Sequence, residues 1–207
     1  MQAATGAVTY GFGPHAGGRR GDAAVEEGGD WDFTPDVSVR DGDEIVGAGW
    51  RFEAVHTPGH TSNHLCFALP ERSILFTGDH VMGWSTSVIA PPDGDMSAYM
   101  ASLDKLLRRS DKVYWPTHGP AITAPQPHVR AFIAHRRERE AGILDCLTGG
   151  PQRIDAIVGK LYIGLAPGLR RAAGRSVHAH LLDLASRGAV AADGPATIDA
   201  LYHYIAR

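Results

Sequence analysis

The sequence predicts a mixed α/β domain followed by a smaller, mainly helical domain. Three observations lead to this division. Short apolar runs separated by turn residues fill residues 37–78, which is the pattern of β-strands. A strand, a helical pattern and another strand follow at 95–115, an order typical of a parallel crossover. From residue 128 onward the apolar residues recur mainly at helical spacing. We therefore expect domains over residues 1–127 and 128–207.

The charge changes sign at the same place. Residues 1–127 hold 9 basic and 16 acidic side chains, a net charge of −7, whereas residues 128–207 hold 11 and 7, a net charge of +4. A basic second domain offers a surface for an anionic partner. No run approaches the roughly 20 apolar residues of a membrane helix, and no secretory signal is visible. We therefore expect a cytoplasmic protein without membrane contact.

The first domain is expected to alternate short strands with turns. Its glycine-rich loop over 13–29 includes His15, whose side chain we expect to be solvated. A tight turn at 41–43 is expected to join two strands as a hairpin. Cys66 and Cys146 lie in apolar segments and are expected to be buried and unpaired. The expected elements are strands over 7–12, 37–39, 50–55, 65–69 and 74–76, a helix over 95–109 and a strand over 113–115.

Three side chains with metal-binding chemistry each follow the end of a predicted strand. They are His60, Asp79 and His118. Because ligand sites gather at the carboxyl ends of strands in such sheets, we expect the three to converge on one edge. Two imidazoles and a carboxylate are donors that zinc, iron or manganese accept.

The residues around these side chains resemble three motifs of the metallo-β-lactamase superfamily. They read His-Thr-Pro-Gly-His-Thr at 56–61, Phe-Thr-Gly-Asp at 76–79 and Pro-Thr-His-Gly-Pro at 116–120. The resemblance is to the branch with glyoxalase II-like enzymes and lactamase-like endoribonucleases. It implies the C-terminal half of the family's αβ/βα sandwich. It also implies two metal ions, normally zinc, with His60 on the first, His118 on the second and Asp79 bridging both.

Three further histidines stand near these motifs. The resemblance implies that His64 braces the loop of the third motif, and we expect His56 to be held in the preceding strand. His80 directly follows Asp79, and two expectations stay open for it, the mouth of a pocket and the exposed surface. Trp84, in the loop beyond, is a candidate pocket wall.

The family's remaining ligands come from a His-x-His-x-Asp-His signature, which residues 1–207 do not contain. We favour a fragment or a mis-started reading frame of a longer enzyme. A pseudoenzyme that lost its metal, or a rearranged site completed by His15, His64 or His80, are the alternatives. A missing first half would uncover one face of the sheet, which predicts a homo-oligomer or self-association.

The second domain is predicted to be a winged helix, because three helices precede a two-stranded hairpin. The cluster at 136–140 is expected on the solvated side of the first helix. Basic residues near the third helix are candidates for nucleic-acid contact, namely Arg170, Arg171, Arg175, His178 and His180. The expected helices are 128–147, 154–161 and 175–186, and the strands lie near 189–191 and 201–202.

The leading functional hypothesis is hydrolysis of an ester, thioester or phosphodiester by a metal-bound hydroxide, as the resemblance implies. The substrate would be a small molecule or RNA. One alternative is an endoribonuclease for single-stranded RNA, with Tyr202 and Tyr204 as candidate stacking residues. The other is a catalytically inactive nucleic-acid-binding protein.

Overall fold

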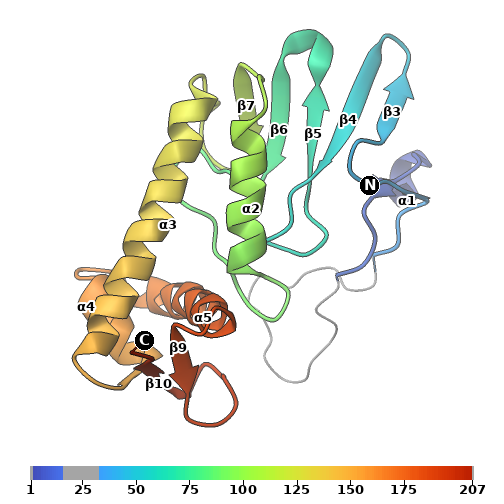
Figure 1. The fold of residues 1–207 in the computed structure, drawn as a ribbon. Helices are drawn as coiled ribbons and strands as arrows, with labels where there is room; N and C mark the ends of the chain where they lie inside the picture. The colour runs from blue at the N-terminus through green and yellow to red at the C-terminus, as the bar shows by residue number, and fades with distance from the viewer. Residues whose placement is uncertain (1, 16–32, 207) are drawn as a thin grey trace.

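A five-stranded sheet forms the centre of the first domain in the computed structural model, which describes residues 2–15 and 33–206 (Figure 1). The strand order is β3-β4-β5-β6-β7. Neighbouring strands are antiparallel except β6 and β7, which are parallel and are joined through α2, so the predicted crossover is confirmed. The elements are β3 (Glu44–Gly47), β4 (Trp50–His56), β5 (Leu65–Leu69), η1 (Pro70–Arg72), β6 (Ile74–Gly78), α2 (Met96–Leu107) and β7 (Val113–Pro116).

Helix α2 begins where its sequence signals predict. Asp95 is the N-cap, and its side chain accepts a hydrogen bond from the backbone N–H of Ala98 at 2.7 Å. Tyr99, Leu103 and Leu106 follow at helical spacing and are fully buried. These side chains pack against the inward-facing residues of the sheet, which include Val55, Cys66, Ala68, Leu75 and Tyr114.

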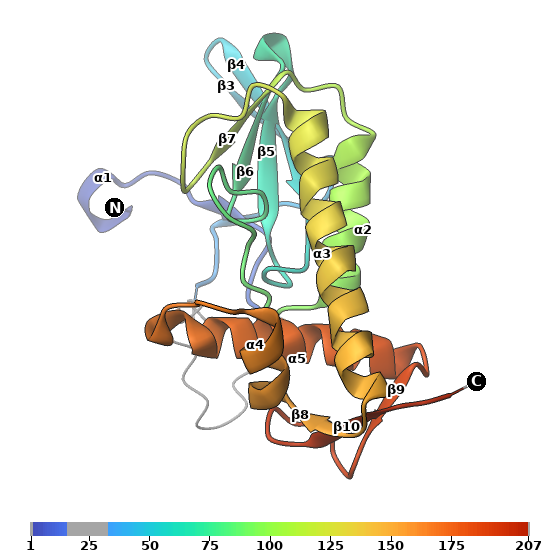
Figure 2. The same cartoon turned by 90° about the vertical axis from the view of Figure 1, so that its left-hand side faces the viewer.

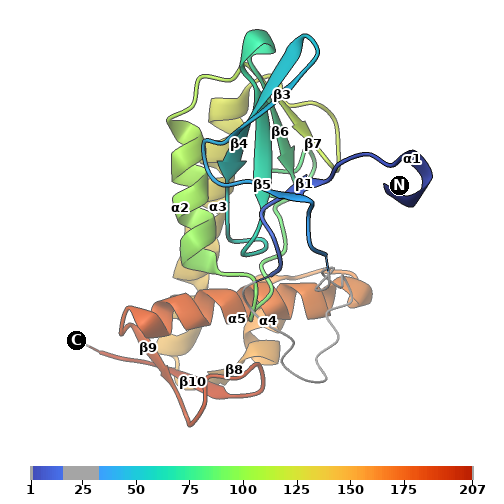
Figure 3. The same ribbon diagram turned by 90° about the vertical axis from the view of Figure 1, so that its right-hand side faces the viewer.

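The two faces of the sheet differ in how they are covered. Helices α2 and α3 (Pro125–Thr148) cover one face, and the N-terminal segment lies on the other side (Figures 2 and 3). That segment contains α1 (Gln2–Thr5) and β1 (Tyr10–Gly11), which pairs in parallel with β2 (Val37–Ser38). The rest of this second face keeps a hollow with a purely apolar lining, which we call the open sheet face, formed by Ile45, Trp50, Phe52, Phe67 and Phe76.

One expected hairpin is wrong. The residues at 41–43 do form a turn, but it leads from β2 into β3. The strand that pairs with β4 is β3, and the chain reverses between Gly47 and Trp50. Strand β2 pairs instead with β1, far earlier in the chain. Turn-forming residues occur both at 41–43 and at 48–49, and residue preferences alone do not decide which of these two turns closes a hairpin.

The second domain has the predicted winged-helix architecture. Its three-stranded sheet has the order β8-β10-β9, so β8 adds a strand to the expected hairpin. Helix α5 begins five residues earlier than expected and crosses below the sheet of the first domain (Figure 2). The elements are β8 (Gln152–Arg153), α4 (Ile154–Leu161), η2 (Pro167–Leu169), α5 (Arg170–Ser186), β9 (Val190–Ala192) and β10 (Leu201–Tyr204).

Helix α3 belongs to both cores. Its first half, with Val129 and Phe132, packs into the core of the sheet domain, and its second half, with Ile143 and Leu147, packs into the core of the winged helix. Helix α3 therefore connects the two domains by packing into both cores. The division at residue 127 cuts through the first turn of this shared helix, and the division itself stays a prediction.

Two simpler expectations concern the cysteines and the helices. Cys66 and Cys146 are both buried and free, as predicted. None of the helices in the described ranges has the length and apolar content needed to cross a membrane. Most of the predicted glycine-rich loop, at 16–29, lies outside the residues that the structure describes.

Candidate functional site

Asp79 and His118 meet at the edge where the parallel strands β6 and β7 end. Gly78, the last residue of β6, is paired with Pro116 at the end of β7, and the Thr117 N–H donates to the Gly78 carbonyl at 3.1 Å. This pairing brings Oδ1 of Asp79 to 3.5 Å from Nε2 of His118. The side chains are 36% and 52% exposed respectively, so a ligand from solvent can reach both.

The carboxylate of Asp79 has an unused acceptor. Its Oδ1 is buried and accepts no hydrogen bond from any described residue. A buried carboxylate oxygen without a donor is costly unless a cation or a proton compensates it. A metal ion would supply that compensation, so this pair fits part of a metal site. Two protein donors are nevertheless fewer than the three or four typical of zinc sites.

Trp84 lies beside this pair. Its ring is stacked on the His118 imidazole, with centroids 6.1 Å apart and planes inclined by 5°. The Gly83 N–H donates to the His118 carbonyl at 2.8 Å, which holds the two loops together. Trp84 is 72% exposed, so its indole forms an accessible apolar surface next to His118, and its expected place at a pocket wall stays a prediction.

His60 is held in a tautomer suited to metal binding. Its Nδ1 lies 2.7 Å from the Val88 carbonyl oxygen, and because a carbonyl only accepts, Nδ1 carries the proton. The lone pair of a neutral imidazole is then on Nε2. The preceding Gly59 has φ +135°, and a Cβ there would lie 2.3 Å from Cα of Tyr99. Only glycine therefore lets the His60 loop approach α2 this closely.

Asp93 braces the same loop from the other side. It accepts hydrogen bonds from the Ser62 hydroxyl at 2.6 Å and the Ser62 N–H at 3.1 Å, and His15 Nδ1 lies 2.7 Å away. The expectation of a solvated His15 is wrong, because its side chain is only 10% exposed. The motif around His60 gave no indication of Asp93, which lies 31 residues beyond Ser62.

His56 and His64 both support the loop that carries His60. His56 Nε2 donates to the Ser62 carbonyl at 3.0 Å, and its ring is stacked on Phe12. His64 Nδ1 lies 2.9 Å from the Thr57 hydroxyl. A Cβ added to Gly78 would lie 2.6 Å from His64 Nε2, so this ring also contacts the strand end before Asp79. Burial lowers the pKa of His64 to about 3, which keeps it neutral.

His80 differs from both expectations for it. Its side chain is fully buried and lies neither at a pocket mouth nor on the surface. The ring lies 4.7 Å from that of Tyr99 and 5.7 Å from that of His64. Burial lowers its pKa well below the usual range, and both ring nitrogens are without a hydrogen-bond partner among the described residues. The turn after β6 directs both His80 and the following Val81 into the core, where each is fully buried.

The described residues bring together a pair of candidate ligands and a third nearby. The His60 ring lies 6.4 Å from the His64 ring, measured between centroids, and the His64 ring lies 5.7 Å from that of His80, the residue after Asp79. Across residues 2–15 and 33–206, no three His, Cys, Asp or Glu side chains are grouped closely enough to hold one metal ion. The expected convergence of three ligands on one edge therefore stays a prediction, although two of them do meet.

Sequence reasoning missed an arginine that contacts the loop between β6 and α2. Arg136 of α3 was expected on the solvated side but is only 3% exposed, and its guanidinium donates to the Ser87 carbonyl. A signal was available in the sequence. Arg136 lies four residues after Phe132 and seven before Ile143, which places it on the apolar face of the helix.

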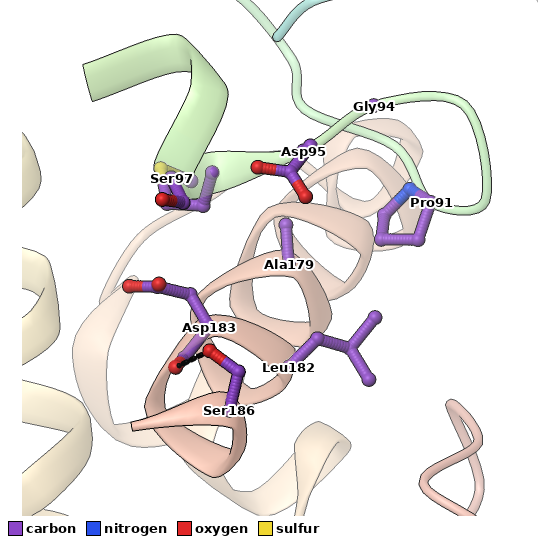
Figure 4. A pocket seen from close by; sticks show the side chains of 9 residues that line it. Pro91, Gly94, Asp95, Ser97, Ala179, Leu182, Asp183 and Ser186 are labelled. Carbon is purple, nitrogen blue, oxygen red and sulfur yellow. Dashed lines mark hydrogen bonds between the residues drawn. The ribbon is translucent and has the colours of Figure 1, made fainter. Parts of the chain in front are cut away.

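The expected nucleic-acid surface of the winged helix is partly buried. His180 is 1% exposed and Tyr202 is fully buried, whereas both were expected to be accessible. His178 Nε2 donates to the Ala196 carbonyl at 3.0 Å. Helix α5 instead faces α2, and a small cavity of about 110 Å³ lies between them (Figure 4). Asp95, at the start of α2, and Asp183 of α5 line this cavity.

Known proteins resemble both parts of the chain. A family model described as "Metallo-beta-lactamase superfamily" matches residues 3–118, and one described as "Beta-lactamase associated winged helix domain" matches residues 154–196. A metallo-beta-lactamase family protein from Thermus thermophilus superposes with a TM-score of 0.73 at 26% identity. The superposition covers 84% of this chain and 55% of that one.

Three curated relatives differ in how their names describe them. "Lactamase-like protein adaB" of Aspergillus niger is 31% identical over 156 residues, covering 67% of this chain and 48% of that protein. "Beta-lactamase-like protein 2 homolog" of Drosophila melanogaster is 34% identical, covering 70% and 49%. "Atrochrysone carboxyl ACP thioesterase dmxR1" of Cryptosporiopsis sp. is 34% identical, covering 53% and 33%. The chain thus spans half or less of the length of these relatives.

Proposed function

Because the chain belongs to the metallo-β-lactamase superfamily, we propose that it supplies metal ligands to a metal-dependent hydrolase whose substrate is an acyl thioester. The observation that carries the proposal is the buried Oδ1 of Asp79, which lacks a hydrogen-bond donor and lies 3.5 Å from Nε2 of His118. The thioester is the narrower part of the proposal. It rests on relatives named as thioesterases, which share 34% and 36% identity with this chain.

Asp79 and His118 would hold one divalent cation, and His60 would offer Nε2 to a second. Zinc, iron and manganese all accept this mixture of imidazole and carboxylate. Such cations acidify bound water and polarise the carbonyl that is cleaved. The hydrogen bond from His60 Nδ1 to the Val88 carbonyl at 2.7 Å fixes both the tautomer and the ring orientation. These three residues leave ligand positions open, and the activity of the whole protein is part of the proposal.

Trp84 would bind the apolar part of the substrate. Its ring is stacked on His118 and is 72% exposed, so an acyl chain placed there would bury indole surface beside the reacting carbonyl. The nucleic-acid alternatives gain less support, because His180 and Tyr202 are buried and α5 contacts α2. The proposed substrate class is therefore an acyl thioester.

The experiment is a thioesterase assay on a short-chain acyl thioester, with released thiol detected in the presence of added Zn²⁺. We compare the wild-type chain with Asp79→Asn and with Asp104→Asn, an exposed residue of α2. The expected result is hydrolysis by the wild type and by Asp104→Asn that is lost in Asp79→Asn. Equal rates in the two variants would mean that Asp79 has no part in the reaction, and the proposal would then be abandoned.

A further inference from the structure

The structure contains a buried arginine whose charge has no acidic partner among the described residues. Arg136 is 3% exposed, and no Asp or Glu of the described ranges lies within ion-pair distance of it. Its Nε also lacks a hydrogen-bond partner there. Burying an unpaired cation is expensive, so something around it must offset the loss of hydration.

The groups that contact the Arg136 guanidinium are a backbone carbonyl and an aromatic ring. The guanidinium donates to the Ser87 carbonyl and lies over the Tyr99 ring, 5.2 Å from its centroid. Ser87 and Tyr99 also hydrogen-bond, through their side-chain hydroxyls, to the turn after β6. The Tyr99 hydroxyl donates to the His80 carbonyl at 3.0 Å, and the Ser87 hydroxyl donates to the carbonyls of His80, at 3.0 Å, and Asp79.

The segment from Asp79 to Ser87 depends on these contacts for its shape. It is the first part of the connection from β6 to α2 and consists of turns and bends, without helix or strand. Its carbonyls therefore cannot be satisfied by a regular backbone ladder and need side-chain donors. Ser87 and Tyr99 donate those hydrogen bonds, and Arg136 holds both donors in place from α3.

We propose that Arg136 is a positioning residue for Asp79, through which helix α3 fixes the loop that carries the candidate metal ligand. Arg136 touches neither Asp79 nor a metal; it acts through Ser87 and Tyr99. The inference rests on the proposed function only in naming Asp79 as a ligand. The mechanical part, that Arg136 orders residues 79–87, stands by itself and can be tested without any metal.

Arg139 provides a matched control on the same helix. Its guanidinium lies over the Tyr162 ring, 4.7 Å from the centroid, and donates to the Leu161 carbonyl at 2.9 Å. Arg139 thus makes the same two kinds of contact as Arg136, but they end within the winged helix. Replacing either arginine removes one cation, one ring contact and one bond to a carbonyl. Arg139 is half-buried and also donates to His135 Nε2 at 3.4 Å, a contact within α3 itself, so none of its partners lies in the loop after β6.

The test is hydrogen–deuterium exchange on the full chain, with peptides covering 79–88 and 158–165. Arg136→Met is expected to accelerate exchange over 79–88 about tenfold or more, the factor for losing a hydrogen bond to a charged group. Arg139→Met is expected to accelerate 158–165 and leave 79–88 unchanged. Arg136→Lys, which keeps the charge, is expected to restore part of the protection.

If Arg136→Met lowers protection everywhere, Ser87→Ala carries the test, because it is a smaller change that removes only the hydroxyl donating to the carbonyls of Asp79 and His80. It is expected to accelerate exchange over 79–88 alone. Unchanged exchange there in Ser87→Ala and Arg136→Lys, or equal acceleration by Arg139→Met, would overturn the inference.

A cobalt titration then separates this inference from the proposed function. We expect Arg136→Met to weaken Co²⁺ binding by about tenfold or more, the loss typical of residues that support a ligand, and Arg139→Met to leave it unchanged. A wild-type chain that binds no Co²⁺ would contradict the proposed function, while the exchange data would still decide whether Arg136 orders the loop. Loop loosening without any change in Co²⁺ affinity would overturn the link to Asp79.

Discussion

His180 is predicted to make the protein sensitive to acid. It is 1% exposed on α5, and burial, followed by the charges of Arg136, His135 and Arg187, lowers its pKa from 6.5 to about 3. Between these two pKa values the imidazole is protonated in the unfolded chain but neutral in the folded protein. Its contribution to stability is therefore complete above pH 6.5 and is lost as the pH falls toward 3.

The size of the effect follows from these two pKa values. Between about pH 7 and about pH 5, protonation of the unfolded imidazole alone lowers the free energy of unfolding by about 2 kcal/mol. Little discount for solvent screening applies, because the side chain is almost fully enclosed. Urea unfolding at several pH values measures this loss directly, from the midpoint and the slope at each pH.

Two replacements separate ionisation from packing. His180→Leu and His180→Gln change the shape and polarity of the side chain differently, so their absolute stabilities should differ. Neither can take up a proton, and both should therefore lose about 2 kcal/mol less than the wild type between about pH 7 and about pH 5. A variant that kept the wild-type pH dependence would refute the reasoning, because another group would then be responsible.

Two further predictions concern the start of α2 and the open sheet face. Asp95→Ala should lower the free energy of unfolding by about 1 kcal/mol, because it removes the cap that accepts the Ala98 N–H, and urea unfolding at neutral pH checks this. An undiminished stability would show that the cap is replaced by solvent. Phe76, which is 39% exposed on the open sheet face, should promote self-association, and Phe76→Thr should weaken that association in sedimentation velocity. A wild-type chain that stays monomeric at every concentration would contradict this expectation.

The sequence predicted those parts of the fold that depend on local patterns. The N-cap at Asp95 and the crossover helix after it appear where the capping residue and helical spacing place them. The three helices of the winged domain also exist as predicted, although α3 and α5 begin earlier than expected and none of the three has a side-chain cap. The hairpin partner of β4 was not predicted correctly, because two nearby turn sequences compete and pairing with β1 decides between them. That pairing joins residues 27 apart, such as Tyr10 and Val37, and leaves no local signal.

The site was predicted only in part, because some of its residues follow from local patterns and others come from distant segments. Asp79 and His118 meet because each follows one of two paired parallel strands, which the order of elements implies. The residues that hold the loops, such as Asp93 and Arg136, come from distant segments and could not be assigned from motifs. His80 was placed at the surface or a pocket mouth because it follows Asp79, yet the turn directs its ring toward Tyr99 in the core.

The central claim is that Asp79 and His118 bind a divalent cation. The most direct measurement is a titration of the metal-free chain with Co²⁺, followed by the visible absorption that reports coordination, in the wild type, Asp79→Asn and Asp104→Asn. The account predicts a saturable signal in the wild type and in Asp104→Asn, and its loss in Asp79→Asn. Identical titrations in all three proteins, or no signal in the wild type, would contradict it.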